Sequence, residues 1–165
     1  MGFRPGMTLS IVVALWLLLT PLLSGTSPAS APQQLSKGQT VYVPVYSNVF
    51  SGPKALPFHL ATTLSIRSTE MTQPFSVTAI DYYDTDGRLV RRHLAKPRVV
   101  NPLATIYVHL DEKDTAGGFG ANFIVSWQAA RTINAPIIEC VMIGATSGQG
   151  ISFVSPGQVI REETR

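Results

Sequence analysis

The chain contains one cysteine, Cys140, among its 165 residues. A disulfide within the chain is therefore excluded, and the hydrophobic core must be stable without a covalent cross-link. Charged residues are also scarce, at 14% of the sequence against 45% hydrophobic residues, which excludes a highly charged disordered chain. The formal net charge of +3 is too small for a strongly cationic nucleic-acid-binding protein, so we expect no nucleic-acid partner.

Sequence motifs for catalysis and metal binding are missing as well. The chain has no HExxH, no CxxC, no phosphate-binding loop and no Gly-x-Ser-x-Gly nucleophile motif. No histidine follows Cys140, which argues against a blue-copper site. We therefore expect no resident cofactor and favour a protein without enzymatic activity. A hydrolase is the alternative, and it needs His59, His93 or His109 within hydrogen-bond reach of Cys140, a serine or a carboxylate.

A long hydrophobic run lies near the N-terminus. Arg4 is the only charged residue before this run, which includes residues 11–19 and is followed by small and polar residues. This order is typical of a secretory signal peptide, which we predict at residues 1–29 with cleavage before Ser30. Because no cysteine stands nearby to carry a lipid, we expect a soluble periplasmic or secreted product with no membrane span after signal removal. An uncleaved anchor is the alternative, although spanning a bilayer takes roughly 20 residues.

Short β-branched and aromatic runs dominate the rest of the chain, separated by Gly, Pro, Asp and Asn. They follow a polar lead-in at residues 30–39, which we predict to be disordered. The connections are too short for helical crossovers, so strand pairing should be antiparallel. We predict one all-β domain over residues 40–160, an antiparallel β-sandwich of about seven to eight strands with immunoglobulin-like architecture. A tail at residues 161–165 follows this domain, and a small closed barrel is the alternative fold.

Five segments carry a resemblance to a known family. They read TVYVPVYS at residues 40–47, ATTLSIRS at 61–68, DYYDTDG at 81–87, DTAGGFGANF at 114–123 and MIGATSGQGISF at 142–153. Together they resemble the bacterial family DUF3124 over nearly the whole chain after the lead-in. The resemblance implies a small exported bacterial protein of unknown activity, with no catalytic residues to carry over. Its most characteristic segments are expected in loops, where binding residues are often found.

Four expected loops, at residues 47–57, 84–87, 111–120 and 146–149, would share one end of the sandwich if every connection reverses the chain. Half of the acidic residues after the signal segment would gather there, and carboxylates with loop carbonyls suit a cation such as Ca²⁺. The complete calcium-loop pattern is absent, so the alternative is that these acids are turn and solvated loop residues. The predicted ligand-binding residues are Asp84, Asp86, Asp114, Gly117, Gly118, Asn122, Ser147 and Gln149, the candidate metal ligands among them being Asp84, Asp86 and Asp114.

Basic residues gather in a second region, which contains Arg88, Arg91, Arg92, Lys96 and Arg98. Because Arg91 and Arg92 are adjacent, a strand would point them to opposite faces, and both cannot enter a core. We predict an edge strand here, whose charges and Pro97 discourage pairing with another strand. The alternative is a patch that faces an anionic partner.

These observations favour an exported cell-envelope protein that binds an envelope protein or ligand through its loop-rich end, without enzymatic activity. Two alternatives stay open. One is an envelope hydrolase with a histidine-assisted site, and the other is a structural adaptor that docks through the basic strand at residues 88–98.

Overall fold

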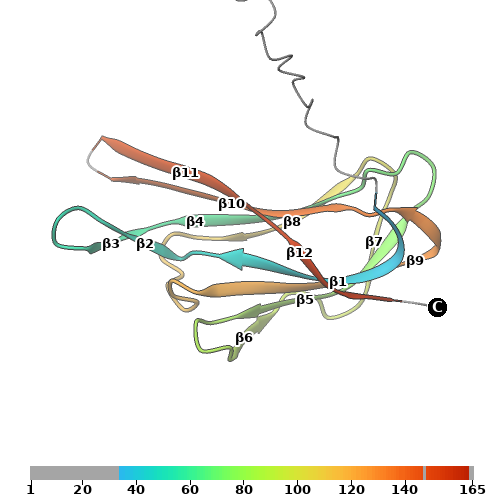
Figure 1. Cartoon of the computed structure of the whole chain (residues 1–165), viewed down its shortest axis with the longest axis horizontal. Coiled ribbons are helices and arrows are strands. Elements are labelled where there is room, and N and C mark those ends of the chain that lie inside the picture. The colour runs from blue at the N-terminus through green and yellow to red at the C-terminus, as the bar shows by residue number, and fades with distance from the viewer. Residues whose placement is uncertain (1–33, 147, 164–165) are drawn as a thin grey trace, which may run out of the picture. The chain divides into compact units, whose positions relative to one another are not determined.

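The computed structural model describes residues 34–146 and 148–163, and this part of the chain is all-β, with no helix (Figure 1). The predicted signal peptide and its cleavage site lie outside the described residues. In chain order the strands are β1 (Leu35–Val45), β2 (Asn48–Ser51), β3 (Leu56–His59), β4 (Ala61–Arg67), β5 (Phe75–Tyr83), β6 (Leu89–Arg92), β7 (Arg98–Val100), β8 (Thr105–Leu110), β9 (Ala121–Asn134), β10 (Ile137–Thr146), β11 (Gln149–Pro156) and β12 (Gln158–Glu162).

These strands form three antiparallel sheets. The largest has the order β12-β1-β9-β5-β6, with β7 also pairing with β5. The second has the order β11-β10-β4-β8, and β2 pairs with β3 in a separate two-stranded hairpin. Figure 1 shows the two larger sheets as separate layers, and the chain passes from one layer to the other where β11 continues into β12.

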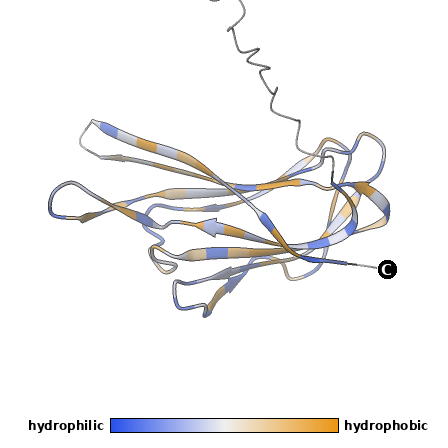
Figure 2. Ribbon diagram, in the orientation of Figure 1, coloured by the Kyte–Doolittle hydropathy of each residue, from blue (hydrophilic) through white to orange (hydrophobic). Residues whose placement is uncertain are grey.

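Alternation of apolar and polar side chains explains why these segments form strands with one buried face. In β9, Phe123, Val125 and Trp127 are buried, whereas the residues between them are half-buried. In β4, Leu64 and Ile66 face the same core. Successive side chains of a strand point to opposite faces, so this period of two places one row of each sheet in the interior. Figure 2 shows the same alternation of hydropathy along the strands.

The prediction of an all-β fold with antiparallel pairing is confirmed. The described residues contain twelve strands rather than the expected seven or eight, because segments expected as loops pair locally. The segment expected as a loop at residues 47–57, for example, forms most of the β2–β3 hairpin, in which Asn48 pairs with His59 and Ser51 with Leu56. The immunoglobulin-like architecture stays a prediction.

Two predictions at the ends of the domain need correction. Strand β1 begins at Leu35, inside the segment expected to be a disordered lead-in, and β12 extends to Glu162, inside the expected tail. The physical reason is a partly buried polar contact between the two ends. The Glu162 carboxylate accepts hydrogen bonds from Ser36 at 2.7 Å and from Gln39 at 2.6 Å. A polar sequence therefore became ordered because the fold supplies its partners.

Candidate functional site

The loop at residues 111–120 lies at the centre of the loop-rich end. Its Gly117 carbonyl accepts hydrogen bonds from the Thr85 backbone and the Thr85 hydroxyl, both at 2.9 Å. The Ser47 amide donates to the Gly118 carbonyl at 3.1 Å. Segments 84–87 and 111–120, together with the start of the segment at 47–57, therefore meet at one end of the domain, as the strand reversals predicted.

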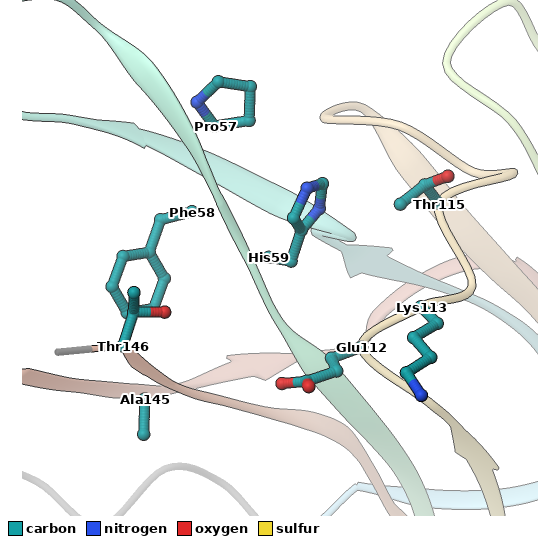
Figure 3. A pocket seen from close by; sticks show the side chains of 8 residues that line it. All are labelled: Pro57, Phe58, His59, Glu112, Lys113, Thr115, Ala145 and Thr146. Atoms are coloured by element: carbon teal, nitrogen blue, oxygen red, sulfur yellow. The ribbon is translucent and has the colours of Figure 1, made fainter.

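The other side of the same loop lines a groove of about 510 Å³. Its lining comes from three distant segments: Pro57, Phe58 and His59 of β3; Glu112, Lys113 and Thr115 of the loop; and Ala145 and Thr146 of β10. In Figure 3, Phe58 lies toward Ala145 and Thr146, whereas His59 lies toward the loop. The groove therefore has an apolar side, and a polar side that carries both charge signs.

Short-range hydrogen bonds hold the loop in shape. The Asp111 carboxylate accepts from the Lys113 amide at 2.9 Å, and the Asp111 carbonyl accepts from the Asp114 amide at 2.9 Å. This is the turn chemistry that aspartate favours at the start of a loop. The turn places Glu112 and Lys113, both exposed, along the groove.

The three aspartates predicted as metal ligands have partners within the chain. The Asp84 carboxylate accepts from the amides of Asp86 at 2.9 Å and Arg88 at 2.8 Å, as a turn residue does. Asp86 forms an ion pair with Arg88 at 3.2 Å, and Asp114 forms one with Arg91 at 3.3 Å. Across residues 34–146 and 148–163, no group of three or more His, Cys, Asp or Glu side chains could hold a metal ion. Calcium binding stays a prediction, and the ion would have to displace these partners.

Gly117 and Gly118 make room for the chain's own side chains. A Cβ atom on Gly117 would clash with the Tyr82 hydroxyl and would approach the Ala121 Cβ to 2.6 Å. Gly118 has a positive φ of 74°, and a Cβ there would lie 2.6 Å from the Thr85 hydroxyl. Because these neighbours fill the space, the glycines serve the packing of the loop onto β5 and the turn at residues 84–87.

Of the last three predicted residues, Asn122 and Gln149 lie in strands of different sheets. Asn122 is half-buried in β9, between Pro44 of β1 and Tyr83 of β5. Gln149 is exposed at the start of β11, and Ser147 lies outside the described residues. None of the predicted ligand-binding residues that the structure describes lines the groove. Their role in binding stays a prediction.

The groove residues were missed for two reasons. His59 follows the expected loop at residues 47–57, and the sequence pattern offers it only as a candidate catalytic histidine. Glu112 and Lys113 resemble ordinary solvated loop charges. The usable signal was proximity to the glycine-rich segment, since both precede Asp114 in a loop already predicted to be functional.

Two of the basic residues, Arg91 and Arg92, lie in an edge strand, as predicted, whereas Arg88 and Lys96 lie outside the strands and Arg98 begins β7. Strand β6, which contains Arg91 and Arg92, is the last strand of the larger sheet and pairs with β5. Arg91 reaches across to Asp114 and so links this edge to the loop at residues 111–120. Arg92, Lys96 and Arg98 are exposed, and none of them forms an ion pair with the described residues.

The buried titratable groups do not assemble a nucleophilic site. Cys140 is fully buried in β10, and burial raises the pKa of its thiol, with the neighbouring Glu139 carboxylate adding to the rise. A thiol with a raised pKa is a poor nucleophile at neutral pH because the thiolate is the reactive form. Among the described residues, no hydrogen bond joins Cys140 to a histidine, and His109 bonds instead with Thr63.

Two further groups lie under the loop. Burial raises the pKa of Tyr82, and its hydroxyl lies 3.2 Å from that of Ser47. Burial lowers the pKa of His93, and the Arg91 charge lowers it further. The His93 Nε2 is buried without a hydrogen-bond partner, and its ring packs on Phe123 with centroids 5.7 Å apart.

Comparison with known proteins places the chain in a family. A search of curated proteins gives no significant match. Among solved structures, the chain is similar to the crystal structure of Thermotoga maritima 1070, at 10% identity and a TM-score of 0.46, covering 76% of this chain and 97% of that chain. Within the described part of the chain, no helix is long and apolar enough to cross a membrane. The family model described as "Protein of unknown function (DUF3124)" matches residues 38–160, so the chain belongs to the DUF3124 family.

Proposed function

We propose that this protein is an exported, non-enzymatic binding module that takes its ligand in the groove at the loop-rich end. The observation that carries the proposal is the meeting of three segments, at residues 57–59, 112–115 and 145–146, around one hollow of about 510 Å³. The combination of an aromatic side chain with one acidic, one basic and one imidazole group suits a small ligand that has both apolar and polar parts.

Export is supported by the N-terminal sequence. The single positive charge, the apolar run and the small-residue segment before Ser30 form the three parts of a secretory signal. The proposed location is the periplasm or the exterior, with a mature chain that begins at Ser30. Mass spectrometry of the protein released from expressing cells tests this, because an intact N-terminus would contradict cleavage.

The binding proposal is tested by NMR of the chain from Ser30. Short peptides and oligosaccharides, the common chemical classes of a cell envelope, serve as probes. We expect amide shifts at residues 58–59, 112–115 and 145–146, and their loss in Lys113→Met. The matched control is Lys96→Met, which removes an exposed lysine outside the groove. Shifts that survive Lys113→Met, or that fall outside the groove, would contradict the proposal.

One observation favours the structural adaptor as a second candidate. Strand β6 is an edge, and the exposed Arg92, Lys96 and Arg98 form no ion pair with the described residues. Such a surface suits an anionic partner, and binding to it would weaken as salt rises. Binding to vesicles containing anionic lipid should then be lost in Arg92→Ala/Lys96→Ala and kept in Lys113→Met.

The hydrolase alternative has a narrower basis. His59 and Glu112 line the same groove, which brings a histidine and a carboxylate to one pocket. Hydrolysis of an ester probe, abolished by His59→Gln, would support this function. An absence of turnover by the folded protein would leave the non-enzymatic proposal standing.

A further inference from the structure

The outer strands are β12, β6 and the three-residue β7 in the larger sheet, and β11 and β8 in the second sheet, and they differ in how they are protected from further pairing. An open edge presents unpaired backbone donors and acceptors to any strand that arrives, and proteins guard such edges with short length, charges, proline or bulges. Strand β6 has four residues, two of them arginine, and a bulge in its pairing with β5. Strand β12 has five residues, including Arg161 and Glu162, and a bulge in its pairing with β1.

Strand β11 has none of these protections along most of its length. It has eight residues, no charged side chain, and a proline only at its last position, Pro156. Its pairing with β10 runs through eight consecutive residue pairs without a shift in register, from Thr146–Gln149 to Glu139–Pro156. No described strand pairs with its outer edge. In Figure 2, strong hydrophilic colour on β11 is confined to the tip of the β10–β11 hairpin.

The surface next to this edge is apolar as well. Val154 of β11 and Ile143 of β10 are 54% and 56% exposed. Val154 lies opposite Val141, and Ile143 lies opposite Ser152, so the exposed side chains are diagonal neighbours across the strand pair. Exposed apolar side chains that continue an open edge are typical of an interaction surface.

We infer that the outer edge of β11 is the interface between two copies of this chain, which pair β11 with β11 in antiparallel orientation about a two-fold axis. Such an interface brings the same strand of both copies side by side, so like charges on a short strand come close to one another. The charged residues on each edge strand therefore indicate which strand can pair with its own copy. Pairing β6 with itself would bring arginines together, whereas β11 brings no charges together. The two four-stranded sheets would then form one continuous eight-stranded sheet.

Strand β8, the other edge of the same sheet, is the nearest competitor. It has six residues and presents His109 and the 67% exposed Tyr107 on its outer face. It is shorter than β11 and carries a polar histidine on its exposed face. A substitution on β8 therefore provides the matched control for one on β11.

The test is the oligomeric state of the protein expressed with its own leader and purified from the cell envelope. Light scattering and sedimentation are measured from about 1 µM to about 1 mM, the span over which a weak interface assembles. We expect the mass to rise from monomer to dimer with concentration. A monomer throughout that range overturns the inference without the need for any variant.

Charged variants then locate the interface. Ser152 and Val154 share the exposed face, so lysines at both positions oppose each other whether the axis lies at residue 152 or 153. We expect Ser152→Lys/Val154→Lys and Ser152→Glu/Val154→Glu each to be monomeric, with an unchanged circular dichroism spectrum. An equimolar mixture of the two should restore the dimer. Tyr107→Lys should dimerise like the unmodified protein.

Three results would overturn the inference. They are a dimer that persists in the lysine variant, a mixture of the two charged variants that stays monomeric, and a dimer that Tyr107→Lys abolishes. The last of these would assign the interface to β8.

Discussion

The loop at residues 111–120 has two sides that use their side chains differently. On one side, Gly117 and Gly118 pack against Tyr82 and Thr85, and Asp114 pairs with Arg91. On the other side, Glu112 and Lys113 line the groove, and their side chains form no hydrogen bond or ion pair with the described residues. The glycines and Asp114, which stand out in the sequence, therefore stabilise the conformation of this loop. Glu112 and Lys113, which look like ordinary surface charges, are available to contact a ligand.

The largest effect should come from filling the space beside Tyr82. In Gly117→Ala the new methyl group meets the Tyr82 hydroxyl and the Ala121 side chain, both buried. Overpacking of this kind costs about 1–3 kcal/mol, so the free energy of unfolding measured in urea should fall by that amount. Gly150→Ala is the control, because only the Gly144 carbonyl lies within 4 Å, at 3.9 Å. Equal losses in both variants would show that Gly117 has no special packing role.

A smaller loss is expected from Thr85→Val. The Thr85 hydroxyl donates to the Gly117 carbonyl at 2.9 Å and accepts from the Gly120 amide at 3.0 Å. Loss of two hydrogen bonds at about 1 kcal/mol each should destabilise the protein by about 1–2 kcal/mol. Thr115→Val on the groove side should change the free energy of unfolding by less than about 0.5 kcal/mol, as exposed substitutions do. Equal losses of unfolding free energy in Thr85→Val and Thr115→Val would contradict the difference between the two sides of the loop.

A still smaller effect should appear as the pH falls. Burial, followed by the Arg91 charge, lowers the pKa of His93 in the folded protein below the 6.5 of an ordinary histidine. The unfolded chain therefore takes up the proton first, so stability falls as the pH drops from about 6.5 toward the lowered folded value. Melting temperatures across this window should decline less steeply in His93→Gln than in the unmodified protein. An equally steep decline in His93→Gln and in the unmodified protein would contradict this origin of the pH dependence.

The smallest expected effect is that of calcium. Asp84, Asp86 and Asp114 are engaged in a turn and in ion pairs, so adding Ca²⁺ after EDTA treatment should leave the melting temperature unchanged. A ligand at 100 times its dissociation constant would add about 2.7 kcal/mol to stability, a readily measured shift. A calcium-specific rise that disappears in Asp114→Ala would establish a cation site on the side of the loop that we describe as structural.

The local features of the fold were predictable from the sequence. The residues 84–87 form the expected turn, with Gly87 at a positive φ of 76° and Asp84 accepting the turn hydrogen bonds. The two adjacent arginines of β6 correctly indicated an edge strand. The order of residues 35–39 was not predictable, because the partner of Ser36 and Gln39 is Glu162, more than 120 residues away. The groove was not predictable for the same reason, because its lining residues come from three segments that are far apart in the sequence.

The amino-acid sequence by itself determined the all-β class, the antiparallel pairing, the turn after β5 and the membership of the DUF3124 family. The structural features follow from patterns within short stretches of the chain, where side-chain alternation, turn chemistry and short connections act, whereas the family membership rests on a match over residues 38–160. The tertiary structure decided which side of the loop at residues 111–120 faces the groove and which strands besides β6 are edges. Those depend on the order of strands in the sheets, which is set by the packing of the whole core between distant segments.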